Sequence, residues 1–169
     1  MPIARIRPAR PTRTAVPVPA SFAALDETHR QIMQMLADME RLLALLSRPG
    51  NDAEAAALAD RICRFFNGAA RQHHETEETF VFPRLLAGAD AGLLAHVRRL
   101  QQDHNWIEED WLELEPHLQA VAQGWRDEHV SFLRDALPGF TALQHEHIAL
   151  EESVIYPEAR QRQSSGMPA

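Results

Sequence analysis

The 169-residue sequence has little cysteine, no long apolar run and no excess of positive charge. Its one cysteine, Cys63, excludes an intramolecular disulfide and a zinc or iron–sulfur site built from cysteines. No apolar run approaches the length that crosses a bilayer, and the net charge of −7 disfavours a nucleic-acid partner held through its phosphates. These absences predict a cytoplasmic globular protein with no membrane or nucleic-acid partner.

The N-terminal segment, residues 1–20, differs from the rest of the chain in composition. It contains five prolines, four arginines and no acidic residue. Proline at this density prevents regular secondary structure, so residues 1–20 are predicted to be a disordered tail, as is the C-terminal segment 163–169. The arginines leave a transit peptide open as an alternative, whereas a secretory signal would need a continuous apolar segment after them.

Residues 21–162 have an apolar pattern with the period of a helix. Large apolar residues recur every three or four positions, and proline and glycine residues divide the pattern into four segments of similar length. Strand-like alternation is absent, so the sequence predicts an all-α fold, an up-down-up-down antiparallel four-helix bundle. The four expected helices begin near Ser21, Asn51, Leu93 and Asp127.

Two segments of the chain repeat each other. HHETEETFVFP, residues 73–83, resembles HIALEESVIYP, residues 147–157, when their final prolines are aligned. His29 precedes His104 by nearly the same interval and, like it, interrupts an apolar stripe. The chain therefore consists of two helical hairpins, each with an isolated histidine on one helix and His-x-x-x-Glu on the next. The six candidate ligands are His29, His73, Glu77, His104, His147 and Glu151.

The spacing of these residues predicts a metal centre. Residues i and i+4 lie on one face of a helix, so each His-x-x-x-Glu pair can address one point in the bundle interior. Antiparallel packing brings the two isolated histidines to the same level of the bundle. Four imidazoles and two carboxylates that can bridge suit two ions of iron or manganese, and zinc less well. A buried salt-bridge network is the alternative for any one pair, but it does not explain two copies in register.

The same pattern resembles a known family. It is carried by His29, His73-x-x-x-Glu77 with the following FVFP, His104, and His147-x-x-x-Glu151 with the following IYP. The family is the hemerythrin-like, or HHE cation-binding, domain, and the likeness covers about residues 22–160. The resemblance implies a four-helix bundle around two non-haem iron ions, with the histidines as terminal ligands and the two glutamates as bridges.

The chain departs from the oxygen-carrying members of that family at two places. Those members have a further histidine one turn after the third-helix histidine, where this chain has Glu108, and they use His-x-x-x-x-Asp on the last helix. The departures move the resemblance toward the bacterial iron-repair proteins and the iron-sensing F-box protein domain. The cysteine-bearing N-terminal domain of the repair proteins is not present in this sequence.

Three further residues are open as contributors to the site. Glu108 is one turn from His104 and is a candidate for a supplementary ligand. His74 and Glu78 are expected to hydrogen-bond around the ligands or to face solvent. A ferritin-like di-iron site would need Glu-x-x-His on two helices, and only Asp26-x-x-His29 has a similar spacing.

The expected function is that of a non-haem di-iron protein that binds or senses O2, NO or peroxide, or that buffers iron. No positioned nucleophile or organic substrate pocket can be argued from the sequence, so a binding or sensing protein is favoured over an enzyme. The alternative is a di-iron oxidoreductase that reduces NO or peroxide.

Overall fold

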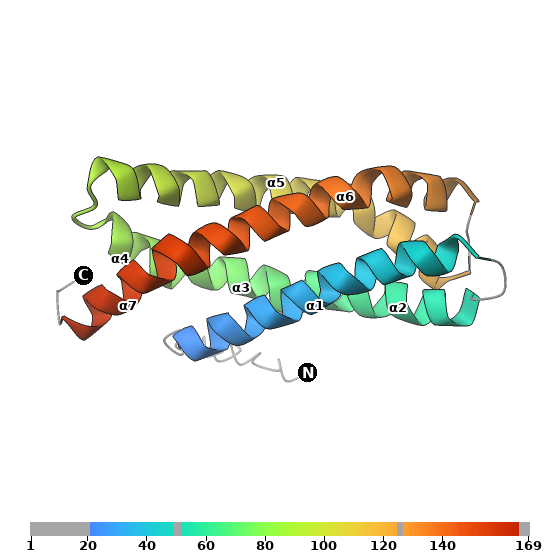
Figure 1. Cartoon of the computed structure of the whole chain (residues 1–169), viewed down its shortest axis with the longest axis horizontal. Coiled ribbons are helices and arrows are strands. Elements are labelled where there is room, and N and C mark those ends of the chain that lie inside the picture. The colour runs from blue at the N-terminus through green and yellow to red at the C-terminus, as the bar shows by residue number, and fades with distance from the viewer. Residues whose placement is uncertain (1–20, 49–51, 125–126, 166–169) are drawn as a thin grey trace, which may run out of the picture.

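The computed structural model describes residues 21–48, 52–124 and 127–165, so the tail expected at 1–20 lies outside the described residues. Four helical rods run side by side along one long axis, and the described residues contain no strand (Figure 1). The predicted all-α, up-down-up-down bundle is therefore confirmed. The first rod is α1 (Phe22–Leu46), and the third is α5 (Ala91–Ala122). The second rod consists of α2 (Asp52–Phe65), η1 (Phe66–Ala70), α3 (Arg71–Thr76), η2 (Glu77–Val81) and α4 (Phe82–Leu86). The fourth rod consists of α6 (Asp127–Leu150), η3 (Glu151–Ile155) and α7 (Tyr156–Ser164).

The turns between rods have sequence causes. Gly88 and Gly124 adopt φ values of 77° and 91°, a left-handed conformation that residues with a side chain rarely reach. The Asp90 carboxylate accepts a hydrogen bond of 2.8 Å from the Leu93 N–H and so caps the start of α5. At the C-terminus α7 continues to Ser164, and residues 166–169 of the expected second tail lie outside the described part of the chain.

The second and fourth rods contain widened turns of π-helix. Two of these turns, η2 and η3, begin at Glu77 and Glu151, and each is followed shortly after its end by Pro83 or Pro157. Proline has no N–H, and its ring crowds the carbonyl of the preceding turn, which favours a widened turn at these two places. The N–H of the residue before each proline donates instead to the carbonyl of the glutamate. The sequence repeat is thus also a repeat of backbone geometry, at two of the expected ligands.

The bundle interior has two apolar clusters with a polar layer between them. Each rod packs on two neighbours, α1 and α5 both lying against α2 and α6. The larger cluster contains Leu42 and Trp111, and the smaller contains Phe82 and Leu100. Burial of these clusters stabilises the bundle apart from any ligand. The polar layer consists of His29, His73, Glu77, Asp103, His104, His147 and Glu151, each at most 8% exposed.

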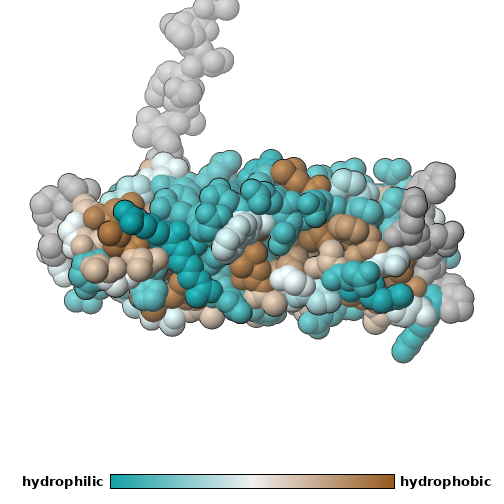
Figure 2. Space-filling model, turned by 90° about the horizontal axis from the view of Figure 1, so that it is seen from above, coloured by the Kyte–Doolittle hydropathy of each residue, from teal (hydrophilic) through white to brown (hydrophobic). Residues whose placement is uncertain are grey.

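The outer surface is mainly hydrophilic on the face that Figure 2 shows, with smaller separate hydrophobic areas. The apolar residues of the helices therefore face chiefly inward, as the period predicts. Among the described helices, none is both long enough and apolar enough to span a membrane.

Candidate metal centre

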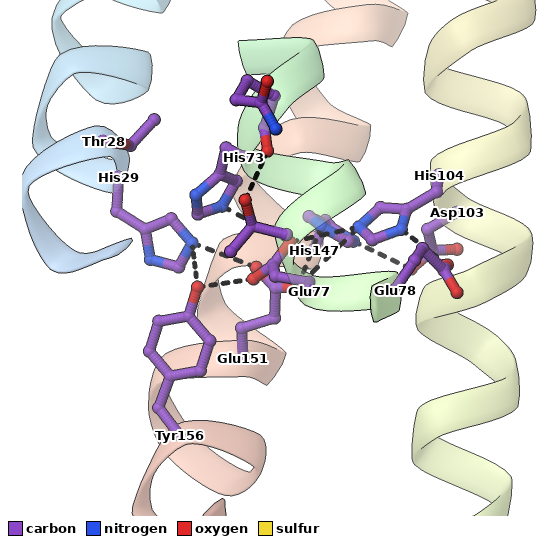
Figure 3. Close-up of polar contacts among 12 residues, drawn as sticks. Thr28, His29, His73, Glu77, Glu78, Asp103, His104, His147, Glu151 and Tyr156 are labelled. Carbon is purple, nitrogen blue, oxygen red and sulfur yellow. Dashed lines mark hydrogen bonds and ion pairs between the residues drawn. The ribbon is translucent and has the colours of Figure 1, made fainter. Parts of the chain in front are cut away.

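The structure brings all six predicted ligands together in the polar layer, from all four rods (Figure 3). Donor atoms there form two groups, and within each group the atoms lie within 4.8 Å of one another. We call these groups the first and the second subsite. The first subsite is His29, His73, Glu77 and Glu151, and the second subsite is His74, Glu77, His104 and His147.

The first subsite joins α1 to the second and fourth rods. His29 Nε2 lies 3.1 Å from Glu151 Oε2, and His73 Nε2 lies 3.4 Å from Glu77 Oε2. The two imidazole rings meet edge to face, with centroids 4.7 Å apart. Two nitrogens and two carboxylates thus face one point.

The second subsite joins α5 to the same two rods. His104 Nε2 lies 3.4 Å from Glu77 Oε2, and the ring centroids of His104 and His147 are 4.7 Å apart. The ring of His74 stacks on that of His104 at 4.2 Å. This subsite therefore has three imidazoles, one more than the first.

The two carboxylates lie between the subsites. Glu151 directs Oε2 toward His29 and Oε1 toward His147, whose Nε2 is 3.2 Å away. Glu77 Oε2 is 3.4 Å from Nε2 of both His73 and His104. Both glutamates are fully buried. A carboxylate in this position can bind a cation on each side.

Two of the histidines are oriented by glutamates from the opposite hairpin. His29 Nδ1 lies 3.1 Å from Glu152 Oε1, and His104 Nδ1 lies 2.9 Å from Glu78 Oε1. A neutral imidazole that donates its Nδ1–H to such a carboxylate keeps the Nε2 lone pair free, which is the arrangement that metal-binding histidines use. His147 has an acidic neighbour of the same kind, but at a longer distance. Asp103 Oδ2 lies 3.8 Å from His147 Nδ1, which is beyond hydrogen-bond distance.

Tyr156 lies beside the first subsite and contacts two of its residues. Its hydroxyl donates a hydrogen bond of 2.5 Å to Glu77 Oε1 and lies 3.1 Å from His29 Nε2. Its ring stacks on that of His29 with centroids 5.0 Å apart. Burial raises the pKa of the Tyr156 phenol, so the group stays a neutral donor.

Many buried polar atoms of the layer have no hydrogen-bond partner. An unpaired buried donor or acceptor costs about 1–3 kcal/mol, so such atoms concentrated at one level need a partner of another kind. A cation accepts electron pairs from imidazole nitrogens and carboxylate oxygens together, and the donor set therefore fits metal ions. The atoms of the layer are both ring nitrogens of His73 and His147, Nε2 of His104, Oε2 of Glu77, Oδ2 of Asp103 and both carboxylate oxygens of Glu151, and Nε2 of the adjacent His74 is unpartnered too.

The pKa values of the layer follow from its burial and its mixed charges. Burial lowers the pKa of His73 to about 3 and that of His74 well below its usual value, so both rings are neutral with free lone pairs. Burial, aided by the charge of Glu151, raises the pKa of Glu77 to about 7. Burial opposes the charged form of His147, but the neighbouring Glu151 carboxylate outweighs it and raises the His147 pKa to about 10. In the absence of a cation, the polar layer therefore binds protons where the cation would bind.

The three residues left open by the sequence have different places in the structure. Glu108 pairs with Arg71 at the surface and belongs to neither subsite. Glu78 binds His104 and also accepts a 2.8 Å hydrogen bond from Gln101. Sequence reasoning placed His74 around the ligands, whereas the structure brings it among the donor atoms of the second subsite. The sequence did contain one indication of this position: His74 precedes Glu77 by three residues, a spacing that puts both side chains on one helix face.

Comparison with known proteins agrees with this geometry. The chain is 26% identical over 144 residues to an uncharacterised protein of Haemophilus influenzae, a match that covers 81% of each chain. No solved structure matches the chain. The family model of the hemerythrin HHE cation-binding domain matches residues 20–159, which include every residue of both subsites. The chain thus belongs to the hemerythrin HHE cation-binding domain family.

Proposed function

We propose that the chain is a non-haem di-iron protein that binds or senses O2, NO or peroxide, or buffers iron. One observation carries the proposal: buried donor atoms, most of them without a hydrogen-bond partner, form two groups that share the carboxylate of Glu77. Each group is the size of a single-ion site, and the shared carboxylate would hold the two ions as a pair. The cytoplasmic location expected from the sequence is part of the proposal.

The six predicted ligands and His74 would hold the ions. His29 and His73 would bind one ion and His74, His104 and His147 the other, with Glu77 and Glu151 between them. Five imidazoles with two carboxylates suit iron or manganese, while zinc favours fewer, tetrahedral ligands. Bound iron would supply reversible one-electron chemistry and open positions for an exogenous ligand.

The chain's own residues favour binding or sensing over turnover. Glu78 and Glu152 fix two histidine rings of the candidate ligand set. These groups orient ligands and hold protons at defined atoms. A di-iron oxidoreductase that reduces NO or peroxide is the second candidate, and the Tyr156 hydroxyl, a hydrogen-bond donor beside the first subsite, is the observation that favours it.

Metal analysis and gas binding test the proposal together. Protein produced in iron-rich medium should contain two iron ions per chain, and the anaerobically reduced form should change its absorption spectrum when O2, NO or hydrogen peroxide is added. A binding protein should react once per centre, whereas an oxidoreductase should consume the added NO or peroxide repeatedly when a reductant is supplied. Protein that retains no iron, or that holds zinc alone under these conditions, contradicts the proposal.

A further inference from the structure

A hollow in the surface reaches the second subsite. It lies beside α3, η2 and α5, has a volume of about 560 Å³, and includes His74 and His104 in its wall. His104 is only 8% exposed, and Nε2 of both rings has no hydrogen-bond partner. The hollow therefore leads from solvent to two imidazole rings whose unpartnered Nε2 atoms are buried just behind its wall.

The mouth of the hollow carries more negative than positive charge. Glu75, Glu78 and Glu108 contribute three carboxylates, against the single guanidinium of Arg71. A recess lined by one sign of charge focuses its field and raises the local concentration of ions of the opposite sign. This lining favours a small cation and disfavours an anion.

One ion pair spans the mouth. Arg71 on α3 pairs with Glu108 on α5, and their side chains are 46% and 45% exposed. An ion pair this exposed contributes little to stability, because solvent screens it. The pair can therefore open without disturbing the helices on either side.

We infer that this hollow is the entrance through which a divalent cation reaches the second subsite, with the Arg71–Glu108 pair as its cover. The inference rests on the proposed function, since it requires a metal centre behind the hollow. The acidic mouth draws the cation in, the pair swings aside, and His74 and His104 are the first nitrogens that the ion meets.

The rate of cobalt(II) uptake by the metal-free full-length chain tests the inference. Visible absorption after stopped-flow mixing gives the rate, and the final Co²⁺ content gives the capacity. Arg71→Ala should take up Co²⁺ faster, by about three- to tenfold, because it removes both the cover and a positive charge. Arg41→Ala, which breaks the exposed Arg41–Glu54 pair between α1 and α2, is the matched control and should keep the wild-type rate.

Two further pairs of variants separate the effect of charge at the mouth on the uptake rate from the effect of steric access through the hollow. Glu75→Gln should slow uptake about twofold and weaken its dependence on salt, while Glu40→Gln, an equal change of charge on α1, should not. Asn105→Trp should obstruct the hollow and slow uptake, while Gln102→Trp, exposed on the same helix outside the hollow, should not.

The two measurements distinguish failure of the inference from failure of the proposed function. Wild-type and variant chains should reach the same final Co²⁺ content, with rates that differ in the order given. If all variants reach the full Co²⁺ content at equal rates, the hollow is not the entrance, while the proposed metal centre is still supported. A wild-type chain that takes up no Co²⁺ overturns both.

Discussion

The two subsites are built from repeated residues, yet they are not equivalent. When Pro83 is aligned with Pro157, Glu78 falls on Glu152, and each of these glutamates hydrogen-bonds the isolated histidine of the other hairpin. The ring of Phe82 stacks on His104 with centroids 5.5 Å apart, as Tyr156 stacks on His29 at 5.0 Å. The repeat therefore supplies a common frame for both subsites.

Two positions break the repeat. His74 falls on Ile148, so only the second subsite gains a third imidazole. Tyr156 falls on Phe82, so only the first subsite has a hydroxyl beside it. Each subsite has four protein residues, but the first has two imidazoles and the second has three. The two subsites therefore differ in their donor sets, although the repeat gives them the same helical frame.

Removal of the shared carboxylate should have the largest effect, because it acts on both subsites at once. Glu77→Ala should lower the metal content from two ions per chain to nearly none, as measured by elemental analysis. The bundle should remain helical by circular dichroism, because the two apolar clusters stay buried. Glu40→Ala, at an exposed position on α1, is the control. Retention of one ion by Glu77→Ala would show that the carboxylate serves one subsite only.

Acid should empty both subsites. Burial and the charge of Glu151 raise the pKa of Glu77 to about 7, so Glu77 is protonated as the pH falls below that value. A proton on this carboxylate must leave before a cation binds, and metal affinity should therefore fall as the pH falls through 7. Titration with metal in weak buffer should release more protons at pH 6 than at pH 8. Equal affinity and equal proton release at the two pH values contradict this.

Substitution of His74 should affect only one subsite. His74→Ile gives the first hairpin the apolar residue type of its counterpart, and the metal content should fall from two ions toward one. His96→Ile, which removes an exposed histidine of α5, should leave both ions in place. Two ions of unchanged affinity in His74→Ile would show that His74 is no ligand and that the subsites are more alike than the structure indicates.

The glutamates that orient the isolated histidines should have matching effects. Glu152→Gln and Glu78→Gln each replace a carboxylate that accepts from an imidazole Nδ1–H, and each should weaken metal binding by about ten- to a hundredfold. Competition with a chelator of known affinity measures the change. A large effect from one variant and none from the other would break the equivalence of the two hairpins.

Removal of the Tyr156 hydroxyl should have the smallest effect. Tyr156→Phe gives the second hairpin the ring of its counterpart Phe82 and leaves Glu77 Oε1 without its hydrogen bond. The free energy of unfolding of the metal-free chain should fall by about 1–2 kcal/mol in urea denaturation. Metal content should not change. A loss of metal from this variant would make the hydroxyl part of the binding set.

The sequence predicted the bundle and six of the seven residues of the polar layer, all but Asp103, because both leave periodic signals. Apolar residues at helical spacing fix the fold, and a histidine within such a stripe, as at His29, stands out against it. His74 was left outside the predicted ligand set for a physical reason. The repeat pairs it with Ile148, so a comparison of the hairpins conceals it, and its proximity to His104 arises from the packing of α3 against α5. The π-helical turns at Glu77 and Glu151 were missed too, although the prolines that cause them were part of the repeat.

The central claim is that two ions share one carboxylate layer in two unequal subsites. A crystal of the iron-loaded protein, measured at the iron absorption edge, tests it most directly through the anomalous difference density. The account predicts two peaks per chain, one bound by His29 and His73 and the other by His74, His104 and His147, with Glu77 and Glu151 contacting both. A single peak, or a second peak with no contact to His74, contradicts it.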